Sequence, residues 1–465
     1  MLELSWIADS LGEGSFRGQG RPEGRVSGVS IDTRTGCEGM IFIALEGEKD
    51  SGSHYIAEAV NSGAGALLIP ADLKIEEETG IPVFAVDDTL KALQKLAADY
   101  RADSAARCVG ITGTVGKTET KELITAMLSE RYRVHSTRGN YNNHIGVPLT
   151  ILSMEKDTEV IVVEMGANHE REIELLASIA RPEIGVITNV GPGHLEFFGS
   201  LEGVARAKSE LLRALPSNGR AILPADSEFL EILSGSTEAG IETFGFSEEA
   251  DWRVEITGSR DTGGYSFELR GAAMESAIPG RYHLLNIAAS AAAASCVGAD
   301  TGEIAAAVAK FRPVDRRGIT YRIDDITFVN DSYNSNPLSL KSSIEGFMEM
   351  PAGGRRWLVL GDMLELGELS EELHRQLGEF CGRVGVYGLV TMGEQTVYIS
   401  REAAGGSRAP EKISHFVNID KLSIFLNSLL ERGDSVLVKG SRNMGMWKVI
   451  DKIEELRETA RERVG

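Results

Sequence analysis

The feature that most constrains this chain is a glycine-rich turn that ends in Gly116, Lys117 and Thr118. The residues before it, 109–112, predict a buried strand, and the apolar residues after it recur at helical spacing. A strand, a glycine turn and a helix in this order form a phosphate cradle. Backbone N–H groups converge on the anion, the helix N-terminus favours negative charge, the lysine reaches the β/γ-phosphates and the hydroxyl binds Mg²⁺. The sequence therefore predicts a nucleotide-binding P-loop.

The spacing of the glycines leaves an alternative open. The usual P-loop pattern wants glycine at position 111, where this chain has Ile111, and it offers Gly110 and Gly113 instead. The same residues also fit an ordinary glycine-rich turn between a strand and a helix. The P-loop is favoured because Gly-Lys-Thr lies between the two elements that a phosphate cradle needs.

Length, charge and cysteine usage limit the class of protein. A chain of 465 residues is long enough for three domains at about 150 residues each. The net charge of −21 argues against a nucleic-acid or anionic membrane surface, although a local backbone site can still bind phosphate. The four cysteines are scattered without a CxxC spacing, as in a reduced cytosolic protein. We therefore expect no nucleic-acid partner and a cytoplasmic location.

The apolar segments predict no membrane insertion. The N-terminus has no basic region, so no signal peptide is expected. The Ala-rich run 287–299 is too short to span a bilayer and predicts a buried helix. We also expect the chain to be a monomer.

Strand and helix patterns alternate and predict an α/β protein of three domains. Residues 1–104 form a small N-terminal α/β domain, 105–318 a central P-loop domain with a parallel sheet, and 319–465 a Rossmann-like, doubly wound domain. The small, charged stretch 101–107 is typical of a linker. Strands at 253–256 and 266–269 suggest an antiparallel addition to the central domain.

Several polar residues of the central domain stand where ligands bind in parallel sheets, beyond the carboxyl ends of strands. Glu164 ends the apolar run 160–163, and His194 follows a strand in a Gly-Pro-Gly-His turn. A carboxylate at this place can assist Mg²⁺, whereas a capping or solvated glutamate is the alternative. The asparagine-rich loop 140–148 is equally consistent with turn chemistry alone. Lys208, on a later helix, is by itself a surface lysine.

The third domain repeats this arrangement. Polar clusters follow three of its predicted strands, at 331–337, 361–363 and 439–442. Because these clusters come after strands of one predicted parallel sheet, we expect them at a common edge.

Taken together, these motifs resemble the Mur ligase family of peptidoglycan synthesis across nearly the whole chain. The matching stretches are Gly-Ile-Thr-Gly-Thr-Val-Gly-Lys-Thr, the 140–148 loop, Glu-Met-Gly at 164–166, Gly-His-Leu-Glu at 193–196, Ala-Lys-Ser-Glu at 207–210, Asp-Ser-Tyr-Asn-Ser-Asn-Pro at 331–337, Leu-Gly-Asp-Met-Leu-Glu-Leu-Gly at 360–367 and Lys-Gly-Ser-Arg at 439–442. The Asp-x-Tyr-Asn-x-Asn-Pro stretch favours the branch that adds D-alanyl-D-alanine over the branch that adds the third peptide residue.

The resemblance implies a reaction and its participants. ATP, UDP-N-acetylmuramoyl-tripeptide and D-Ala-D-Ala would give the pentapeptide, ADP and phosphate through an acyl phosphate. Lysine, helix dipole and two Mg²⁺ ions would offset the repulsion between carboxylate and triphosphate. The alternatives are a Mur-family ligase with another acceptor amine, and a nucleotide-binding regulator that kept the fold without catalysis.

The resemblance also implies roles by position. Lys117, Lys208 and His194 would be catalytic. Thr118 and Glu164 would hold the first Mg²⁺ and His194 the second. Lys208 matches the lysine that the family carboxylates with CO₂, which turns a cation into a carbamate suited to Mg²⁺.

The remaining implied contacts concern the nucleotide and the substrates. The nucleotide contacts are Gly113, Thr114, Val115, Gly116, Lys117, Thr118, Asn286, Arg317 and Asp331. Asn286 and Arg317 match adenine- and phosphate-side contacts, and Asp331 matches a ribose contact. The substrate contacts are Thr33 and Arg34 near the uridine diphosphate, with Asn142, Asn143, Asn334 and Asn336 near the peptide.

The chain departs from the family pattern at four places. Glu119 stands where the family more often has Ser or Thr, and Tyr282-His283 replaces a frequent His-Asn. Arg316 fills a position usually taken by glycine. In the first domain the usual Asp-Gly-His appears as Ser-Gly-Ser-His at 51–54. His374 has the family's spacing after the Leu-Gly-Asp-Met motif, and the sequence assigns it no role.

Overall fold

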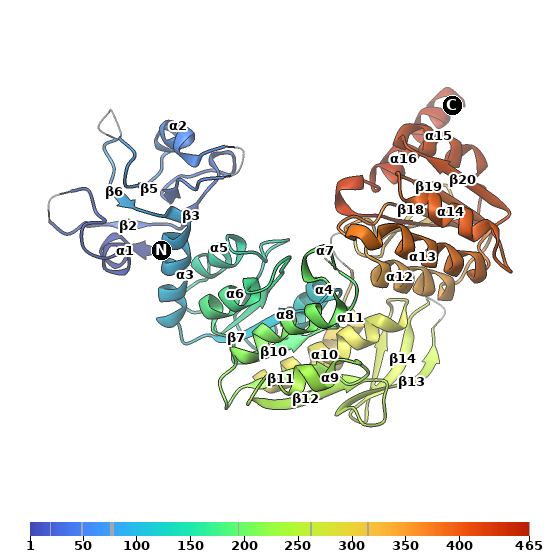
Figure 1. Cartoon of the computed structure of the whole chain (residues 1–465), viewed down its shortest axis with the longest axis horizontal. Helices are drawn as coiled ribbons and strands as arrows, with labels where there is room; N and C mark the ends of the chain where they lie inside the picture. Colours follow the sequence, from blue (N-terminus) through green and yellow to red (C-terminus); the bar gives the residue numbers. More distant parts are fainter. Residues whose placement is uncertain are drawn as a thin grey trace.

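The computed structural model describes residues 1–465 except 19, 48–49, 75–78, 194, 261–262, 314–315 and 465. Within these residues the strands form four sheets, and the chain is built from three successive α/β units (Figure 1). The N-terminal unit, blue in Figure 1, and the C-terminal unit, orange to red, lie at opposite ends of the middle unit. The α/β, three-unit architecture expected from the sequence is confirmed, whereas the residue limits 1–104, 105–318 and 319–465 stay a prediction.

The N-terminal unit is a small parallel sheet with short helices. Its sheet has the order β3-β4-β5-β6, and β1 pairs with β2 in a separate ribbon. Its elements are β1 (Leu2–Glu3), α1 (Leu4–Leu11), β2 (Arg25–Val26), β3 (Val29–Ser30), the 3₁₀ turn η1 (Thr33–Thr35), β4 (Ile41–Ile43), η2 (Gly52–Tyr55), α2 (Ile56–Asn61), β5 (Ala66–Pro70), β6 (Val83–Val86) and α3 (Thr89–Ala102).

The last helix of this unit joins it firmly to the next. Helix α3 packs against α5 and α6 of the middle unit, and Leu93 and Leu96 belong to a core that spans both. The stretch 101–107 connects α3 to β7 and is only partly exposed. Arg101 is buried and donates to the carbonyl of Ala180 at 2.8 Å.

The middle unit carries a large sheet of the order β15-β14-β13-β12-β11-β10-β7-β9-β8. Strands β7 to β13 are parallel, and β13, β14 and β15 form the expected antiparallel addition. Its elements are β7 (Arg107–Thr112), α4 (Lys117–Leu128), β8 (Val134–Ser136), α5 (Gly146–Leu152), β9 (Val160–Glu164), α6 (Glu172–Ala180), β10 (Ile184–Ile187), α7 (Leu195–Phe198), α8 (Leu201–Arg213), β11 (Arg220–Pro224), α9 (Leu230–Ser234), β12 (Gly240–Gly245), β13 (Trp252–Ser259), β14 (Tyr265–Leu269), β15 (Ala272–Ser276), α10 (Arg281–Val297) and α11 (Thr301–Lys310).

The position of β7 decides where a ligand site can form. β7 lies between β9 and β10, so the loops that follow these three strands share one edge of the sheet. All three strands are almost entirely apolar because helices cover both faces of the sheet. The Ala-rich run forms most of α10, which packs on α4 and is buried as expected.

The C-terminal unit is a doubly wound sheet of the order β16-β17-β21-β18-β19-β20, parallel except for the edge strand β16. Its elements are β16 (Ile319–Ile323), β17 (Ile326–Asn330), α12 (Pro337–Glu349), β18 (Arg356–Gly361), η3 (Gly367–Leu369), α13 (Ser370–Val384), β19 (Gly388–Met392), α14 (Thr396–Ala404), β20 (Lys412–Phe416), α15 (Ile419–Leu429), β21 (Ser435–Lys439), η4 (Arg442–Met444) and α16 (Lys448–Val464). Within the described residues, no helix combines the length and apolar character that a membrane span requires.

Candidate active site

The glycine turn after β7 has the geometry of a phosphate cradle. Gly113 and Gly116 adopt positive φ angles of 150° and 82°, and α4 begins at Lys117. A Cβ at Gly113 would collide with the hydroxyl of Thr188, and one at Gly116 with Oδ1 of Asn286. The turn therefore requires glycine at 113 and 116. The usual glycine at 111 is dispensable here, because Ile111 is a buried residue of the strand.

The P-loop lysine folds back over the turn that precedes it. Lys117 Nζ donates to the carbonyls of Gly113 at 2.8 Å and Thr114 at 3.3 Å. Burial lowers the pKa of Lys117, the nearby Glu164 carboxylate opposes this shift, and Arg317 adds to it. The amine is therefore held against the glycine turn, near the negative charge of Glu164 and the positive charge of Arg317.

Two predicted site residues, one at the start of α4 and one in the 140–148 loop, converge on the carboxylate at the end of β9. Thr118 Oγ1 donates to Glu164 Oε2 at 2.7 Å, and Asn142 Nδ2 donates to Glu164 Oε1 at 2.7 Å. Glu164 is only 2% exposed. The capping or solvated glutamate that the sequence left open is therefore excluded by burial and by these partners.

Lys121 supports this carboxylate, and the sequence analysis missed it. Its Nζ is buried and donates to the carbonyl of Thr137 at 2.6 Å. The Thr137 hydroxyl in turn accepts the backbone N–H of Glu164 at 3.0 Å. A lysine one helical turn after Lys117 was the available signal, because a charged side chain on the covered side of this helix has to find a buried acceptor.

The loop after β10 lies directly against the P-loop. Thr114 Oγ1 donates to the carbonyl of Gly191 at 3.1 Å and accepts its N–H at 3.0 Å. Asn189, which the sequence analysis also missed, accepts from the N–H of Val115 at 3.0 Å and donates to its carbonyl at 3.0 Å. His194, the residue of this loop predicted to hold a metal, lies outside the described residues.

Lys208 is not the surface lysine that its sequence context suggested. It lies on α8, is 3% exposed, and its Nζ is 5.8 Å from the centroid of the Phe198 ring. Burial lowers the pKa of Lys208 to about 7, helped by the positive charge of Lys117. Glu210 of the same motif is structural, because its carboxylate accepts the N–H groups of Arg171 and Glu174 at the start of α6.

Asn286 presents an open amide beside the P-loop. It lies on α10, is buried, and its Oδ1 closely approaches Gly116. Its Nδ2 is buried without a hydrogen-bond partner among the described atoms. Because an unpaired buried amide is costly, this donor fits a polar ligand that lies over the P-loop.

The three polar clusters of the C-terminal unit meet as predicted. Lys439 Nζ donates to Asp331 Oδ2 at 2.7 Å and to the carbonyl of Asn334 at 3.0 Å. Ser441 Oγ accepts the N–H of Leu364 at 2.9 Å, which ties the 361–367 stretch to the same edge. The sequence analysis named Lys439 as part of a cluster but gave it no role, and it is the buried cation that links two of these clusters.

The two arginines before β16 stack on aromatic rings. The guanidinium of Arg317 lies 3.6 Å from the centroid of the Tyr333 ring, and that of Arg316 lies 4.4 Å from the Trp447 ring. Arg316 has a φ of 58°, in the left-handed region that glycine adopts most easily. The backbone therefore explains why glycine suits this position.

Two predicted asparagine contacts have structural duties. Asn143 Oδ1 accepts the N–H groups of Ile145 and Gly146, which is the turn chemistry left open for this loop. Asn336 caps α12, with its Oδ1 2.8 Å from the N–H of Ser339. Their side-chain oxygens are therefore occupied by backbone N–H groups.

Thr33 and Arg34 lie apart from this cluster, in the N-terminal unit. They form η1 after β3, and the carboxylate of Asp32 accepts from Arg34 Nε at 2.9 Å and Nη2 at 2.7 Å. The arginine is mostly exposed. Its hydrogen bonds to Asp32 hold the pKa of that carboxyl below its usual value.

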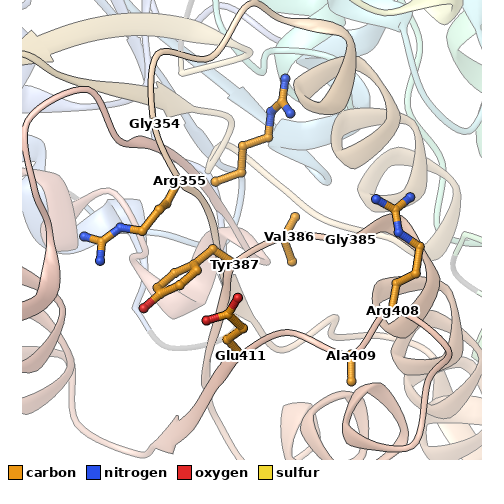
Figure 2. Close-up of a pocket in the computed structure, with 9 residues that line it drawn as sticks. Gly354, Arg355, Gly385, Val386, Tyr387, Arg408, Ala409 and Glu411 are labelled. Atoms are coloured by element: carbon orange, nitrogen blue, oxygen red, sulfur yellow. The ribbon is translucent and has the colours of Figure 1, made fainter.

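A pocket of ≈ 360 Å³ lies in the C-terminal unit (Figure 2). It is lined by Gly354, Arg355, Arg356, Gly385, Val386, Tyr387, Arg408, Ala409 and Glu411. These residues border the amino ends of β18, β19 and β20, whereas the polar clusters follow carboxyl ends. Arg355, a prominent side chain of its wall, is already paired with Asp434 at 2.8 Å. The pocket therefore contributes nothing to the arrangement around the P-loop.

The fold and the site define a P-loop protein of three α/β units, with the phosphate cradle in the middle one. Three family models match consecutive parts of this chain: the Mur ligase family, catalytic domain over 25–101, the Mur ligase middle domain over 111–294, and the Mur ligase, glutamate ligase domain over 316–442. The chain belongs to the Mur ligase family. It is thus a ligase of that family, as its motifs had indicated.

Similar proteins extend over nearly the full length of the chain. A UDP-N-acetylmuramoyl-tripeptide–D-alanyl-D-alanine ligase of Escherichia coli (strain K12) is 35% identical over 98% of this chain and 98% of its own length. The ligase of the same name from Bacillus subtilis (strain 168) is 33% identical over 92% of this chain and 93% of its own.

Solved structures agree in fold. MurF from Acinetobacter baumannii superposes with a TM-score of 0.88 at 27% identity, covering 98% of this chain and 99% of that one. MurF from Thermotoga maritima in complex with ADP gives a TM-score of 0.81 at 28% identity, covering 94% and 98%.

Proposed function

We propose that this protein joins D-Ala-D-Ala to UDP-N-acetylmuramoyl-tripeptide in an ATP-dependent, ADP-forming reaction. The observation that carries the proposal is the convergence of Thr118, Glu164 and Asn142 beside a P-loop. It occurs in a chain that matches ligases of this name over almost its whole length.

The chemistry requires the tripeptide carboxylate to be activated. One carboxylate oxygen attacks the γ-phosphorus of ATP, ADP leaves, and an acyl phosphate forms. The amine of D-Ala-D-Ala then attacks the acyl carbon through a tetrahedral intermediate, loses a proton, and phosphate leaves as the amide bond forms. Carboxylate and triphosphate repel each other, so the site has to supply positive charge. Lys117 and the N-terminus of α4 do so at the β/γ-phosphates.

Thr118 and Glu164 fit a magnesium site. They offer a hydroxyl and a carboxylate 2.7 Å apart, and Mg²⁺ prefers oxygen ligands. Within the described residues, no cluster of three or more acidic, histidine or cysteine side chains surrounds them. The other ligands of such an ion would be phosphate oxygens and water. When bound, the ion would neutralise charge on the triphosphate. A second ion, with His194 among its ligands, is part of the proposal.

Lys208 fits the proposed carbamate. CO₂ reacts with a neutral amine, and burial brings the pKa of Lys208 to about 7, so much of the amine is neutral near pH 7. The carbamate would replace a buried cation near Lys117 with an anion, which removes the repulsion that helps to lower this pKa.

The remaining contacts are proposed by position. The nucleotide would rest on Gly113, Thr114, Val115 and Gly116, with Asn286 at the adenine side, Arg317 at the phosphate side and Asp331 at the ribose. The substrates would contact Thr33 and Arg34 at the uridine diphosphate, and Asn142, Asn143, Asn334 and Asn336 at the peptide. Because these residues come from all three units, closure of the units would complete the site and exclude water from the acyl phosphate. A cytoplasmic monomer stays a prediction.

A substrate panel tests the proposal. ADP release by the full chain is measured with UDP-N-acetylmuramoyl-tripeptide and, in turn, D-Ala-D-Ala, D-Ala and a diamino acid, and products are identified by mass spectrometry. We expect stimulation by the dipeptide and a product mass that includes it.

Stimulation by the diamino acid alone, with a UDP-linked dipeptide as the other substrate, would assign the chain to another branch of the family. Nucleotide binding without ADP release for any acceptor would favour the regulator that the sequence left open. Either result would overturn the proposed reaction.

A further inference from the structure

A buried carboxylate–imidazole contact joins the P-loop helix to the helix of Asn286, and the proposed reaction gives it no role. Glu119 Oε1 lies 2.5 Å from His283 Nδ1, and the two side chains are 13% and 6% exposed. Both residues stand where the sequence departs from the family pattern. Because Glu119 and His283 contact each other in the folded chain, we treat the two differences from the family pattern as one pair.

Two other close contacts beside it also join α4 and its N-terminal turn to α10. Oδ1 of Asn286 lies so close to Gly116 that a Cβ there would collide with it. Ser290 Oγ donates to the carbonyl of Thr120 at 3.2 Å. His283 lies one helical turn before Asn286 on the same face of α10. The distance between the P-loop and Asn286 is therefore fixed by contacts on both sides of Asn286.

The residue before His283 extends this connection to the C-terminal unit. The Tyr282 ring centroid is 3.9 Å from that of His283, and helix α10, which carries both rings, contacts α12 of the C-terminal unit. On α12, Ser343 Oγ donates to Asp331, the residue proposed at the ribose. A shift of His283 would therefore alter the nucleotide contacts of two units.

We propose that Glu119 and His283 form a positioning pair, which keeps Asn286 at the distance from the P-loop that a bound adenine nucleotide requires. This rests on the proposed function, because it presupposes ATP in the P-loop. A hydrogen bond to an ionised carboxylate is strong in a site poor in water. The imidazole also holds the Glu119 carboxylate away from the triphosphate, which a mobile carboxylate would repel.

Binding of Mg–ADP to the full chain, measured by isothermal titration calorimetry, tests the pair without a second substrate. Glu119→Thr and His283→Asn each leave a buried partner without its contact, so each is expected to weaken binding about tenfold. The double variant leaves neither partner behind. The double variant is expected to bind Mg–ADP with an affinity within about threefold of the parent's. The losses of the two single variants would then not add, as they would for independent sites.

Two further variants separate positioning from other roles. Glu119→Gln can still accept from His283 Nδ1 and is expected to bind ADP within about threefold of the parent. Glu130→Ala is the matched control, because Glu130 pairs with Lys310 at 2.9 Å across the far end of α4 while both side chains are exposed. It is expected to leave ADP binding unchanged. In steady-state assays the single variants should raise the KM for ATP about tenfold with kcat within about twofold.

Urea midpoints and circular dichroism report whether each variant is folded. Single variants that are less stable but bind ADP like the parent would make the pair merely structural and overturn the proposal. So would a double variant whose loss equals the product of the single losses. A higher Mg²⁺ requirement in Glu119→Gln would make Glu119 a metal ligand, which also overturns it. Failure of the parent itself to bind ADP would instead remove the proposed function.

Discussion

The carboxyl edges of the two large sheets carry similar residues and use them differently. In the middle unit, Asn286 keeps an unpaired donor within the described residues, and the buried amine of Lys208 lies against the Phe198 ring. In the C-terminal unit, Asp362 accepts the N–H groups of Glu394 at 2.8 Å, Gln395 at 3.1 Å and Thr396 at 2.8 Å. The carboxylate oxygens of Asp362 are therefore occupied by backbone N–H groups at the start of α14.

His374 belongs with Asp362. It is fully buried, its Nδ1 donates to the carbonyl of Ser370 at 2.7 Å, and its Nε2 accepts the N–H of Met363 at 3.1 Å. The residue to which the sequence assigned no role is therefore a structural, neutral imidazole. The comparison teaches that a polar residue beyond a strand can belong to the scaffold, as Asp362 does, and that an open donor such as Asn286 Nδ2 is the stronger sign of a ligand contact.

The largest effect should come from Lys208. Lys208→Ala removes the proposed carbamate and is expected to lower ligation at least about 10³-fold, measured as ADP release. The variant should be as stable as the parent or more so, because it no longer buries an amine whose pKa burial has lowered. A short-chain carboxylic acid should partly restore activity by supplying the missing anion.

The exposed Lys310 provides the control for this variant. Lys310→Ala removes a lysine of an exposed ion pair and should leave ligation unchanged. Full activity of Lys208→Ala without added acid would rule out the carbamate. It would also place Lys208 with the architectural residues of the other sheet.

Glu164→Gln should have the next largest effect. The amide keeps the shape of the carboxylate but lacks its charge, so the proposed metal site loses its acidic ligand within the described chain. We expect kcat to fall about 10²-fold and the Mg²⁺ concentration for half-maximal rate to rise. The measurement is the ADP-release rate as a function of Mg²⁺. An unchanged Mg²⁺ dependence would contradict the proposed metal role.

Much of the middle unit could be predicted from sequence because its signals are local. The P-loop strand, the turn and the helix are contiguous, and Glu164 directly ends an apolar strand. By contrast, the partners of Lys121 and Asn189 could not be identified, because they lie in other loops that only the folded sheet brings near. The strands that were missed, such as β6, β8 and β20, are short or lie at sheet edges, where the apolar pattern is weak.

In the C-terminal unit the sequence located the polar clusters. It could not distinguish residues that could contact a ligand from residues that stabilise the fold. Nothing local distinguishes Asp331, which pairs with Lys439, from Asp362, which caps a helix two strands away. Asn336 was expected at the substrate and caps α12. Such duties depend on tertiary hydrogen bonds, so only coordinates reveal them.

Asp362→Ala should have the opposite effect to Lys208→Ala. It should lower the stability of the protein and leave nucleotide binding nearly unchanged. Three N–H groups at the start of α14 would lose their acceptor, at a cost of about 2–4 kcal/mol. Hydrogen exchange of the α14 amides should accelerate strongly and the urea midpoint should fall, while Mg–ADP binding stays within about threefold. Asn418→Ala, which removes one exposed cap bond to Lys421, should cost only about 1 kcal/mol. Weaker ADP binding in Asp362→Ala, at unchanged stability, would make Asp362 part of the nucleotide site.

The smallest effect concerns the pH dependence of stability through His374. Burial lowers the pKa of His374 below 6.5, so as the pH falls the unfolded chain takes up this proton before the folded chain does. The contribution of the neutral ring is thus complete above about pH 6.5. It is lost as the pH falls toward the folded-state pKa, with a slope of at most about 1.4 kcal/mol per pH unit. His374→Gln can still accept from the N–H of Met363 but does not titrate. Urea unfolding between pH 5 and 8 should therefore show a shallower decline for this variant than for the parent, and equal slopes would mean that His374 titrates normally in the folded chain.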